Sequence, residues 1–390
     1  MSGRRTLLAA CLAGGMLLSA CASFTEQPPP EAWQPQQPLT PQAGPDPQIP
    51  GEGNPEGGNE APPPASIPPP DGCTDYNPLV LGTCLDPVYA VAAFPGDGTD
   101  PIALVGERKT GRIMRVRRNE QPVVVATLPV EAGTDGGLTG LALSPNYAED
   151  RLLFAYITTE TDNRLVRLAE GDTPKPVLTG IPRGPSGNKG ALALDHRGAL
   201  LVATGDAGNP ALATDANSLA GKVLRVTAAG KPAEDNPNRG TPIVANGVHA
   251  PGGVCSSMDG ARMWVTDREP RRDVLYRLDL GKPLGEPAWT WPDRPGVAGC
   301  LSSADAIAVV TTVAANLQIL PLTPDGRFSG KPQVSLSDKE GFGRLAGADL
   351  VNDRLGIAGT VNKDTGGTPI SSDDRAVLII PTGGSGGSID

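Results

Sequence analysis

The sequence lacks an excess of basic side chains. Its 390 residues hold 33 Lys and Arg against 43 Asp and Glu, so its net charge at pH 7 is −10. Nucleic acids and anionic lipid surfaces are recognised by clusters of Lys and Arg. We therefore expect neither a nucleic-acid partner nor a polybasic membrane-binding patch, and we expect a monomer kept soluble by its acidic surface.

Long apolar runs are missing as well, except near the start of the chain. There, Thr6–Leu18 follows two arginines but is too short to span a bilayer as a helix. The residues Leu18–Cys21 read Leu-Ser-Ala-Cys and match a bacterial lipobox, in which small residues precede a cysteine. This pattern predicts cleavage before Cys21, acylation of its thiol by palmitate or a similar chain, and a lipoprotein anchored on the extracytoplasmic face of the cell membrane. The alternative is an ordinary secretory signal with an incidental cysteine.

Basic residues are absent again between Arg5 and Arg108, and the middle of that stretch is rich in proline. Residues 21–71 contain 16 of the 42 prolines. Such a segment cannot bury enough apolar surface to offset the entropy lost on ordering. We therefore expect a signal peptide over residues 1–20, a lipid anchor and disordered linker over 21–71, and a folded domain over 72–390.

The motif Cys-x-x-Cys is also absent, which disfavours a zinc site or a dithiol redox centre. Cys11 lies in the predicted signal peptide and Cys21 is the predicted lipidation site, which leaves four of the six cysteines in the folded domain. An even number in an exported protein indicates disulfide bonds. Proximity in the sequence favours Cys73–Cys84, and elimination then leaves Cys255–Cys300.

Helical periodicity of apolar residues is not sustained over a dozen residues anywhere in the folded domain, which excludes a helical repeat protein. The region from Val88 to Ile380 instead breaks into six similar units spaced by roughly 50 residues, the spacing of propeller blades. Each unit has a Gly-led strand, a tight turn, an aliphatic strand and usually a third strand with an arginine between aliphatic residues. We predict an all-β, six-bladed β-propeller. A further strand around Tyr76–Leu81 would complete the last blade, and the bond Cys73–Cys84 would pin that closure.

The third unit carries the clearest pattern. Two alternating runs, Ala191–Leu194 and Ala199–Thr204, flank a Gly-containing turn and predict a hairpin. A third strand, Lys222–Val226, follows after a long polar loop that begins Thr-Gly-Asp-Ala-Gly-Asn. Loops of that length more often hold functional residues than serve only to connect strands.

These motifs resemble those of the glucose/sorbosone dehydrogenase family, the soluble PQQ-dependent sugar dehydrogenases. The resemblance covers about Val88 to Ile380, and its strongest motifs are Gly136–Pro145, Asn163–Leu168, Gly190–Asp206 and Asn217–Arg225. It implies a propeller that holds PQQ and Ca²⁺ and oxidises a sugar hydroxyl. The order of lipobox, Pro-rich linker and propeller is also similar to that of a mycobacterial lipoprotein.

In this family a histidine removes the hydroxyl proton while hydride passes to the quinone, and an aspartate orients that histidine. The matching base position here is Gly187, whereas Asp206 matches the orienting aspartate; its alternative role is to cap a turn. Only two histidines exist. We expect His196, in a hairpin turn, on the solvated surface. His249 replaces an arginine that contacts PQQ, so we expect it to line the central mouth, either as a functional residue or as an ordinary loop histidine.

The resemblance places three further residues beside the cofactor. Asp135 stands where members have Gln or Glu, and Arg344 matches the arginine that opens the last blade. Lys189 lies next to the vacant base position. It is either a base whose pKa is lowered by burial or an ordinary solvated loop lysine. Calcium ligands cannot be assigned, because many are backbone carbonyls.

Three functions are compatible with these residues. Because loss of a general base costs about 10²–10⁴ in rate, we favour a degenerate propeller that binds a sugar, a cell-wall glycan or another partner in the cell envelope. The alternative is an active PQQ- and Ca²⁺-dependent glucose/sorbosone (aldose) dehydrogenase. A third possibility is a metal-dependent, lactonase-like propeller that uses Asp135, Asp206 and Asp267.

Overall fold

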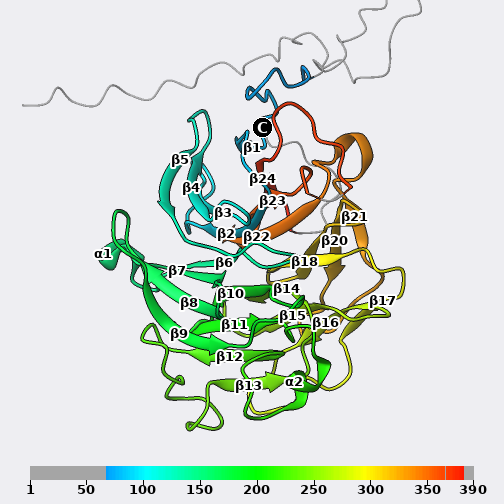
Figure 1. The fold of residues 1–390 in the computed structure, drawn as a ribbon. Helices are drawn as coiled ribbons and strands as arrows, with labels where there is room; N and C mark the ends of the chain where they lie inside the picture. Colours follow the sequence, from blue (N-terminus) through cyan, green and yellow to red (C-terminus); the bar gives the residue numbers. More distant parts are fainter. Residues whose placement is uncertain (1–66, 365, 382–390) are drawn as a thin grey trace, which may run out of the picture. The chain divides into compact units, whose positions relative to one another are not determined.

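Six four-stranded antiparallel sheets make up the computed structural model, which describes residues 67–364 and 366–381 (Figure 1). The predicted signal peptide, Cys21 and nearly all of the predicted linker lie outside the described residues. Among the described residues the α-helices are short, α1 (Tyr147–Asp150) and α2 (Pro210–Thr214), with one 3-10 turn, η1 (Asp338–Glu340). No helix in this part of the chain has the length and apolar character needed to cross a membrane.

The sheets follow one another along the chain. The first three are β2 (Val88–Ala93), β3 (Ile102–Glu107), β4 (Arg112–Arg117), β5 (Val123–Thr127); β6 (Leu138–Leu143), β7 (Leu153–Thr158), β8 (Asn163–Leu168), β9 (Lys175–Ile181); and β10 (Gly190–Leu194), β11 (Leu200–Thr204), β12 (Lys222–Val226), β13 (Ile243–Asn246). The next two are β14 (Pro251–Ser256), β15 (Met263–Arg268), β16 (Asp273–Arg277), β17 (Trp289–Trp291); and β18 (Val297–Ser302), β19 (Ala306–Thr311), β20 (Leu317–Pro321), β21 (Gln333–Ser335). The last is β22 (Leu345–Asn352), β23 (Leu355–Thr360), β24 (Ala376–Ile379) and β1 (Val80–Gly82).

The first strands of the blades, β2, β6, β10, β14, β18 and β22, contact one another in a closed ring. This arrangement confirms the predicted six-bladed propeller. Large apolar side chains pack between neighbouring blades: Phe154 of the second blade and Leu200 of the third, for example, belong to one buried cluster. Each such side chain stabilises the fold by about 1.5–3 kcal/mol relative to exposure. The repeats thus share their core across blade boundaries.

The predicted three-strand pattern does not include the outermost strand of the first five blades. The side chains of β5 and β21 are mostly exposed, and β9 carries Lys175 and Pro176 at its start. Edge strands that face water need no alternation of apolar residues, so their sequences resemble loops.

The ring closes with β1, which pairs with β24 through Val80 opposite Val377. This confirms the predicted closure, with the strand a few residues later than expected. The bond Cys73–Cys84 encloses β1, and the two Cα atoms lie 5.4 Å apart. The second predicted disulfide, Cys255–Cys300, is confirmed too and joins the inner strands β14 and β18.

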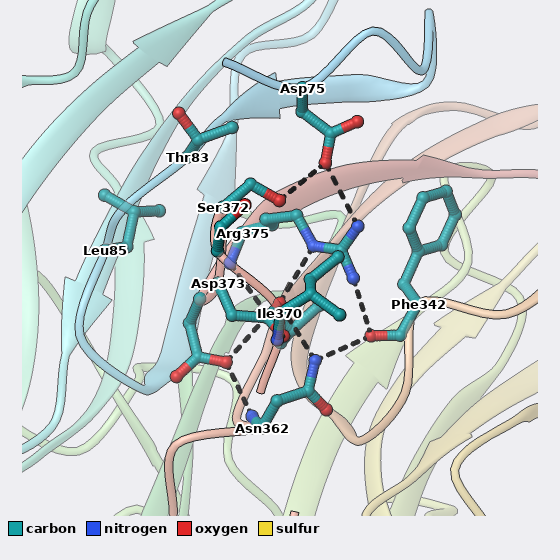
Figure 2. A network of polar contacts seen from close by, with 12 residues as sticks. Asp75, Thr83, Leu85, Phe342, Asn362, Ile370, Ser372, Asp373 and Arg375 are labelled. Carbon is teal, nitrogen blue, oxygen red and sulfur yellow. Dashed lines mark hydrogen bonds and ion pairs between the residues drawn. The ribbon is translucent and has the colours of Figure 1, made fainter. Parts of the chain in front are cut away.

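Buried polar contacts reinforce this closure (Figure 2). Arg375 lies 3.2 Å from Asp75, whose side chain is 3% exposed, and 2.9 Å from Asp373. The same guanidinium donates to the carbonyl of Phe342 at 3.2 Å, while Ser372 Oγ donates to Asp75 at 2.8 Å. A buried arginine so surrounded ties the start of the folded domain to its last blade.

Candidate functional site

The first residues of several inner strands surround a hollow at one end of the propeller channel. Two adjoining spaces of about 190 and 290 Å³ lie there. They share Tyr89, Asp135, Lys189, Arg268 and Thr312, and we call them together the central cavity. Residues just before a first strand, or at the end of a second strand, meet at this face because those two strands run antiparallel.

Cations predominate around the central cavity. The lining includes five basic residues, namely Arg108, Lys189, Arg268, Arg294 and Arg344, against two carboxylates, Asp135 and Asp364. Only Lys189 and Arg344 among the five were predicted. The positions of two others follow from the direction of their strands. Arg108 directly follows β3 and Arg268 ends β15, so both lie where a second strand of a blade reaches the cavity.

Arg108 and Asp364 form the most buried ion pair of the cavity. Their closest atoms lie 3.3 Å apart, and the arginine side chain is 4% exposed. Arg108 also donates to the carbonyl of Gly136 at 2.8 Å, and Tyr89 Oη donates to Asp364 at 2.8 Å. Although burial opposes ionisation of Asp364, hydrogen bonds from Lys109 and Tyr89 together with nearby positive charges lower its pKa to about 2. The pair therefore stays charged throughout the physiological pH range.

Lys189 points into the cavity, so the expectation of an ordinary solvated loop lysine is wrong. Its Nζ lies 4.7 Å from the centre of the Tyr89 ring. Burial, followed by the charge of Arg268, lowers the pKa of Lys189 to about 8. The physical reason for the error is position: residue 189 directly precedes the inner strand β10, which places its side chain on the channel side rather than on the outer surface.

The vacant base position is closed to a side chain. Gly187 has φ +65°, a left-handed conformation that favours glycine. A Cβ atom at this position would lie 2.6 Å from Asp206 Oδ1. Asp135 fixes the segment, because its Oδ2 accepts the N–H of Gly187 at 2.9 Å and its Oδ1 accepts that of Asn188 at 3.3 Å. The loop is thus built around glycine rather than around a missing imidazole.

Asp206 instead contacts the other candidate histidine. Its Oδ2 lies 3.0 Å from His249 Nδ1, and the imidazole is 30% exposed. Its Oδ1 accepts the N–H of Gly208 at 2.9 Å. The two roles considered for Asp206, orienting a histidine and capping a turn, therefore coexist.

Asp267 holds the His249 loop. Its two carboxylate oxygens accept the backbone N–H groups of His249 at 2.9 Å and Ala250 at 2.6 Å. Burial raises the pKa of Asp267 to about 6. The next residues, Ala250 and Pro251, line the central cavity, whereas His249 itself is not among the described residues that line either of its two spaces.

The two remaining predicted residues lie at opposite ends of the inner strands. Arg344 lines the central cavity, and its guanidinium donates to the carbonyl of Gly366 at 2.9 Å. His196 is exposed in the β10–β11 turn, at the opposite end of the inner strands, in agreement with the expectation.

The three aspartates of the lactonase-like hypothesis do not converge. Asp135 binds the 187–188 segment, Asp206 binds the His249 side chain, and Asp267 binds the backbone N–H groups of His249 and Ala250. Within residues 67–364 and 366–381, no three His, Cys, Asp or Glu side chains are grouped so that they could hold a metal ion.

Comparison with known proteins gives concordant matches. The family model described as Glucose / Sorbosone dehydrogenase matches residues 86–295. The aldose sugar dehydrogenase YliI of Escherichia coli is 28% identical over 234 residues, which cover 55% of this chain and 62% of that protein. The match therefore spans less than two thirds of this curated relative.

Solved structures match over more of their length. The PQQ-bound aldose sugar dehydrogenase of Streptomyces coelicolor is 27% identical with a TM-score of 0.70, covering 77% of this chain and 95% of that one. A Thermus thermophilus protein described as a putative oxidoreductase (glucose dehydrogenase) is also 27% identical, with a TM-score of 0.69 and coverage of 77% and 98%.

Proposed function

The chain belongs to the glucose/sorbosone dehydrogenase family, and we propose that it acts in the cell envelope by binding an anionic ligand in its central cavity. The five cations around that cavity carry this proposal. Arginine and lysine form charge-assisted hydrogen bonds to carboxylates that are about twice as strong as neutral ones. Asp135 and Asp364 line the cavity with them, and Asp273 lies 4.0 Å from Arg294, so the basic side chains described here outnumber the carboxylates beside them and favour a ligand with several negative charges.

PQQ fits this chemistry, because it is a tricarboxylate and a similar protein is described as PQQ-bound. Arg108, Lys189, Arg268 and Arg344 would hold its carboxylates and quinone oxygens. When bound, it would supply a quinone that accepts hydride from a sugar hydroxyl. Calcium needs six to eight oxygen ligands. Because the described residues group no three acidic side chains around one point, backbone carbonyls and the bound anion would have to supply most of them.

The family's usual proton transfer has no equivalent at position 187. Gly187 carries no imidazole, and the contact expected for a Cβ with Asp206 leaves no room for one. Because loss of a base costs about 10²–10⁴ in rate, we propose that the propeller binds a sugar or cell-wall glycan beside its anionic ligand and oxidises it little.

One observation favours a second candidate, an active aldose dehydrogenase. The contact between Asp206 Oδ2 and His249 Nδ1 leaves Nε2 of the imidazole available as an acceptor. A carboxylate that orients a histidine is the arrangement used for general bases. In this candidate His249, which lies on a different loop from Gly187, removes the proton of the sugar hydroxyl.

A binding titration combined with an activity assay tests these proposals. The full chain with Cys21→Ser, purified without detergent, is titrated with PQQ by calorimetry with and without Ca²⁺. We expect binding that weakens with salt, and a loss of about tenfold or more in Arg268→Ala, because one charge-assisted contact contributes about 1.5–3 kcal/mol. Arg272→Ala is the matched control, since Arg272 pairs with Glu269 in the same hairpin and does not line the cavity.

The outcomes separate the candidates. Absence of PQQ binding would contradict the cofactor assignment. Equal losses of PQQ affinity in Arg268→Ala and Arg272→Ala would contradict binding in the central cavity. Binding without sugar oxidation supports the binding function. Binding with turnover that disappears in His249→Gln supports the enzyme.

We also propose that the mature protein is anchored on the extracytoplasmic face of the membrane by lipid at Cys21. The lipobox and the short apolar run before it support this placement. The two disulfides of the folded domain are consistent with export to an oxidising compartment.

A further inference from the structure

A second, larger cavity lies at the opposite end of the inner strands from the central cavity. Its volume is about 610 Å³. All six inner strands line it near their ends, five of them through their last residues and β22 through a residue two positions before its end: Ala93, Leu143, Leu194, Ser256, Ser302 and Leu350. We call it the distal cavity. Its size falls in the range of small-molecule sites, about 300–1,000 Å³.

The wall of the distal cavity is mainly apolar. Phe94 and Tyr147 line it and pack edge to face, with ring centres 5.2 Å apart. The bonded Cys255 and Cys300 contribute to the wall from two neighbouring blades. None of the five cations of the central cavity reaches this end. A ligand here would therefore differ in chemistry from the polycarboxylate proposed for the other end.

One carboxylate in this wall has no cationic partner. Asp349 on β22 accepts the N–H of Ala93 at 2.9 Å with Oδ2 and that of Leu350 at 2.9 Å with Oδ1. A carboxylate offers about four acceptor positions, so both oxygens retain capacity. Among the described residues, no Lys, Arg or His forms an ion pair with it. Burial raises the pKa of Asp349 to about 6, as expected for an anion that lacks compensation.

The other charged groups in the lining are already engaged or lie at the surface. Asp195 is paired with the buried Arg225 at 2.5 Å. Arg151 lies over the Tyr147 ring at 5.7 Å and is exposed, as is His196. Asp349 is therefore the charged group of the distal cavity that a ligand would neutralise.

We propose that the distal cavity binds an amphiphilic amine, whose apolar body fills the cavity and whose ammonium group pairs with Asp349. Apolar burial provides the affinity, and the uncompensated carboxylate selects a cation over a neutral or anionic head group. This site is independent of the function proposed for the central cavity.

Three probes of equal chain length test the assignment: decylammonium, decanol and decanoate, each below its micelle concentration. Binding to the full chain carrying Cys21→Ser is measured by calorimetry at pH 7 and 0.15 M salt. We expect one site per chain, with decylammonium bound about tenfold more tightly than decanol and decanoate bound weakest. Asp349→Asn should abolish the preference for the ammonium while decanol binding stays within about twofold.

A filling variant locates the site. Ala193→Phe places a ring in the distal cavity and should abolish binding of all three probes, whereas Val334→Phe, at an exposed position of β21, should not. The proposal is overturned if no probe binds, if decanoate binds best, or if Asp349→Asn leaves the order unchanged. Equal binding to Ala193→Phe and the original chain would also overturn it. Circular dichroism of each variant verifies that it is folded.

Discussion

His249 Nδ1 lies 3.0 Å from Asp206 Oδ2, although the two residues belong to loops on either side of a blade boundary. The resemblance described above matches Asp206 with the aspartate that orients the catalytic histidine in the family. In this chain it orients an imidazole that enters from the next loop, while Gly187 leaves the original position without a side chain. The carboxylate has kept a histidine partner even though the usual histidine is absent.

This contact yields a prediction about activity. Without an imidazole at 187, sugar oxidation in the presence of PQQ and Ca²⁺ should stay below about one percent of that of an active relative. Any residual turnover should vanish in His249→Gln, because that variant lacks the imidazole that Asp206 orients. A dye-linked assay measures both. If turnover persists in His249→Gln and its pH–rate profile has a limb at pH 8 or above, the base would be Lys189 instead.

The lowered pKa of Lys189 predicts how ligand affinity depends on pH. A polyanion next to Lys189 favours the charged form of the lysine, so ligand binding raises the pKa of Lys189 from about 8. Above that pH, the lysine therefore takes up a proton when the ligand binds. Affinity for PQQ should therefore fall as pH rises through about 8. Calorimetry at pH 7 and 9 in the original chain and in Lys189→Met tests this. A variant with the same pH dependence as the original would rule out Lys189 as the titrating group.

Closure of the ring predicts a large effect on stability. Arg375→Ala leaves Asp75 and Asp373 buried without this cationic partner, and breaking a buried ion pair from one side costs about 3–5 kcal/mol. The free energy of unfolding from urea titration should fall by that order. Arg354→Ala, in the exposed β22–β23 turn, is the control and should change it by less than about 0.5 kcal/mol. Similar values for the two variants would show that the buried network does not stabilise the closure.

The lipid anchor is tested by one substitution. Cys21→Ser removes the thiol that would be acylated, so the domain should be released from the membrane fraction or remain unprocessed. Detergent partitioning and mass spectrometry of the mature protein distinguish these states. A variant that stayed in the membrane and was processed to the same mass would show that the anchor is not at Cys21.

The fold was largely predictable because its signal repeats along the chain. Alternating residues such as Ala191–Leu194 identify inner strands, and even the pairing of Cys255 with Cys300 followed from counting. The outer strands were missed because water-exposed edges, as in Gln333–Ser335, need no apolar alternation.

The candidate site was predictable only in part. Asp135, Lys189 and Arg344 were placed at the cavity by their motifs, but the solvated alternative for Lys189 failed because local sequence does not reveal burial. Arg108 and Arg268 lie in no recognised motif, and only the direction of their strands places them together. The contact between Asp206 and His249 joins residues 43 positions apart. Such a contact depends on how blades meet, for which one sequence carries no direct signal.

If the protein is anchored through Cys21, as proposed, the bond Cys73–Cys84 has a mechanical consequence. The strand β1 lies wholly inside the loop that this bond closes. Tension applied from the N-terminal side reaches Cys73 and crosses directly to Cys84 through the two sulfur atoms. The pull thus bypasses β1, and the pairing of Val80 with Val377 carries no load while the bond is intact. Reduction would reroute the same force through β1 and load its pairing with β24.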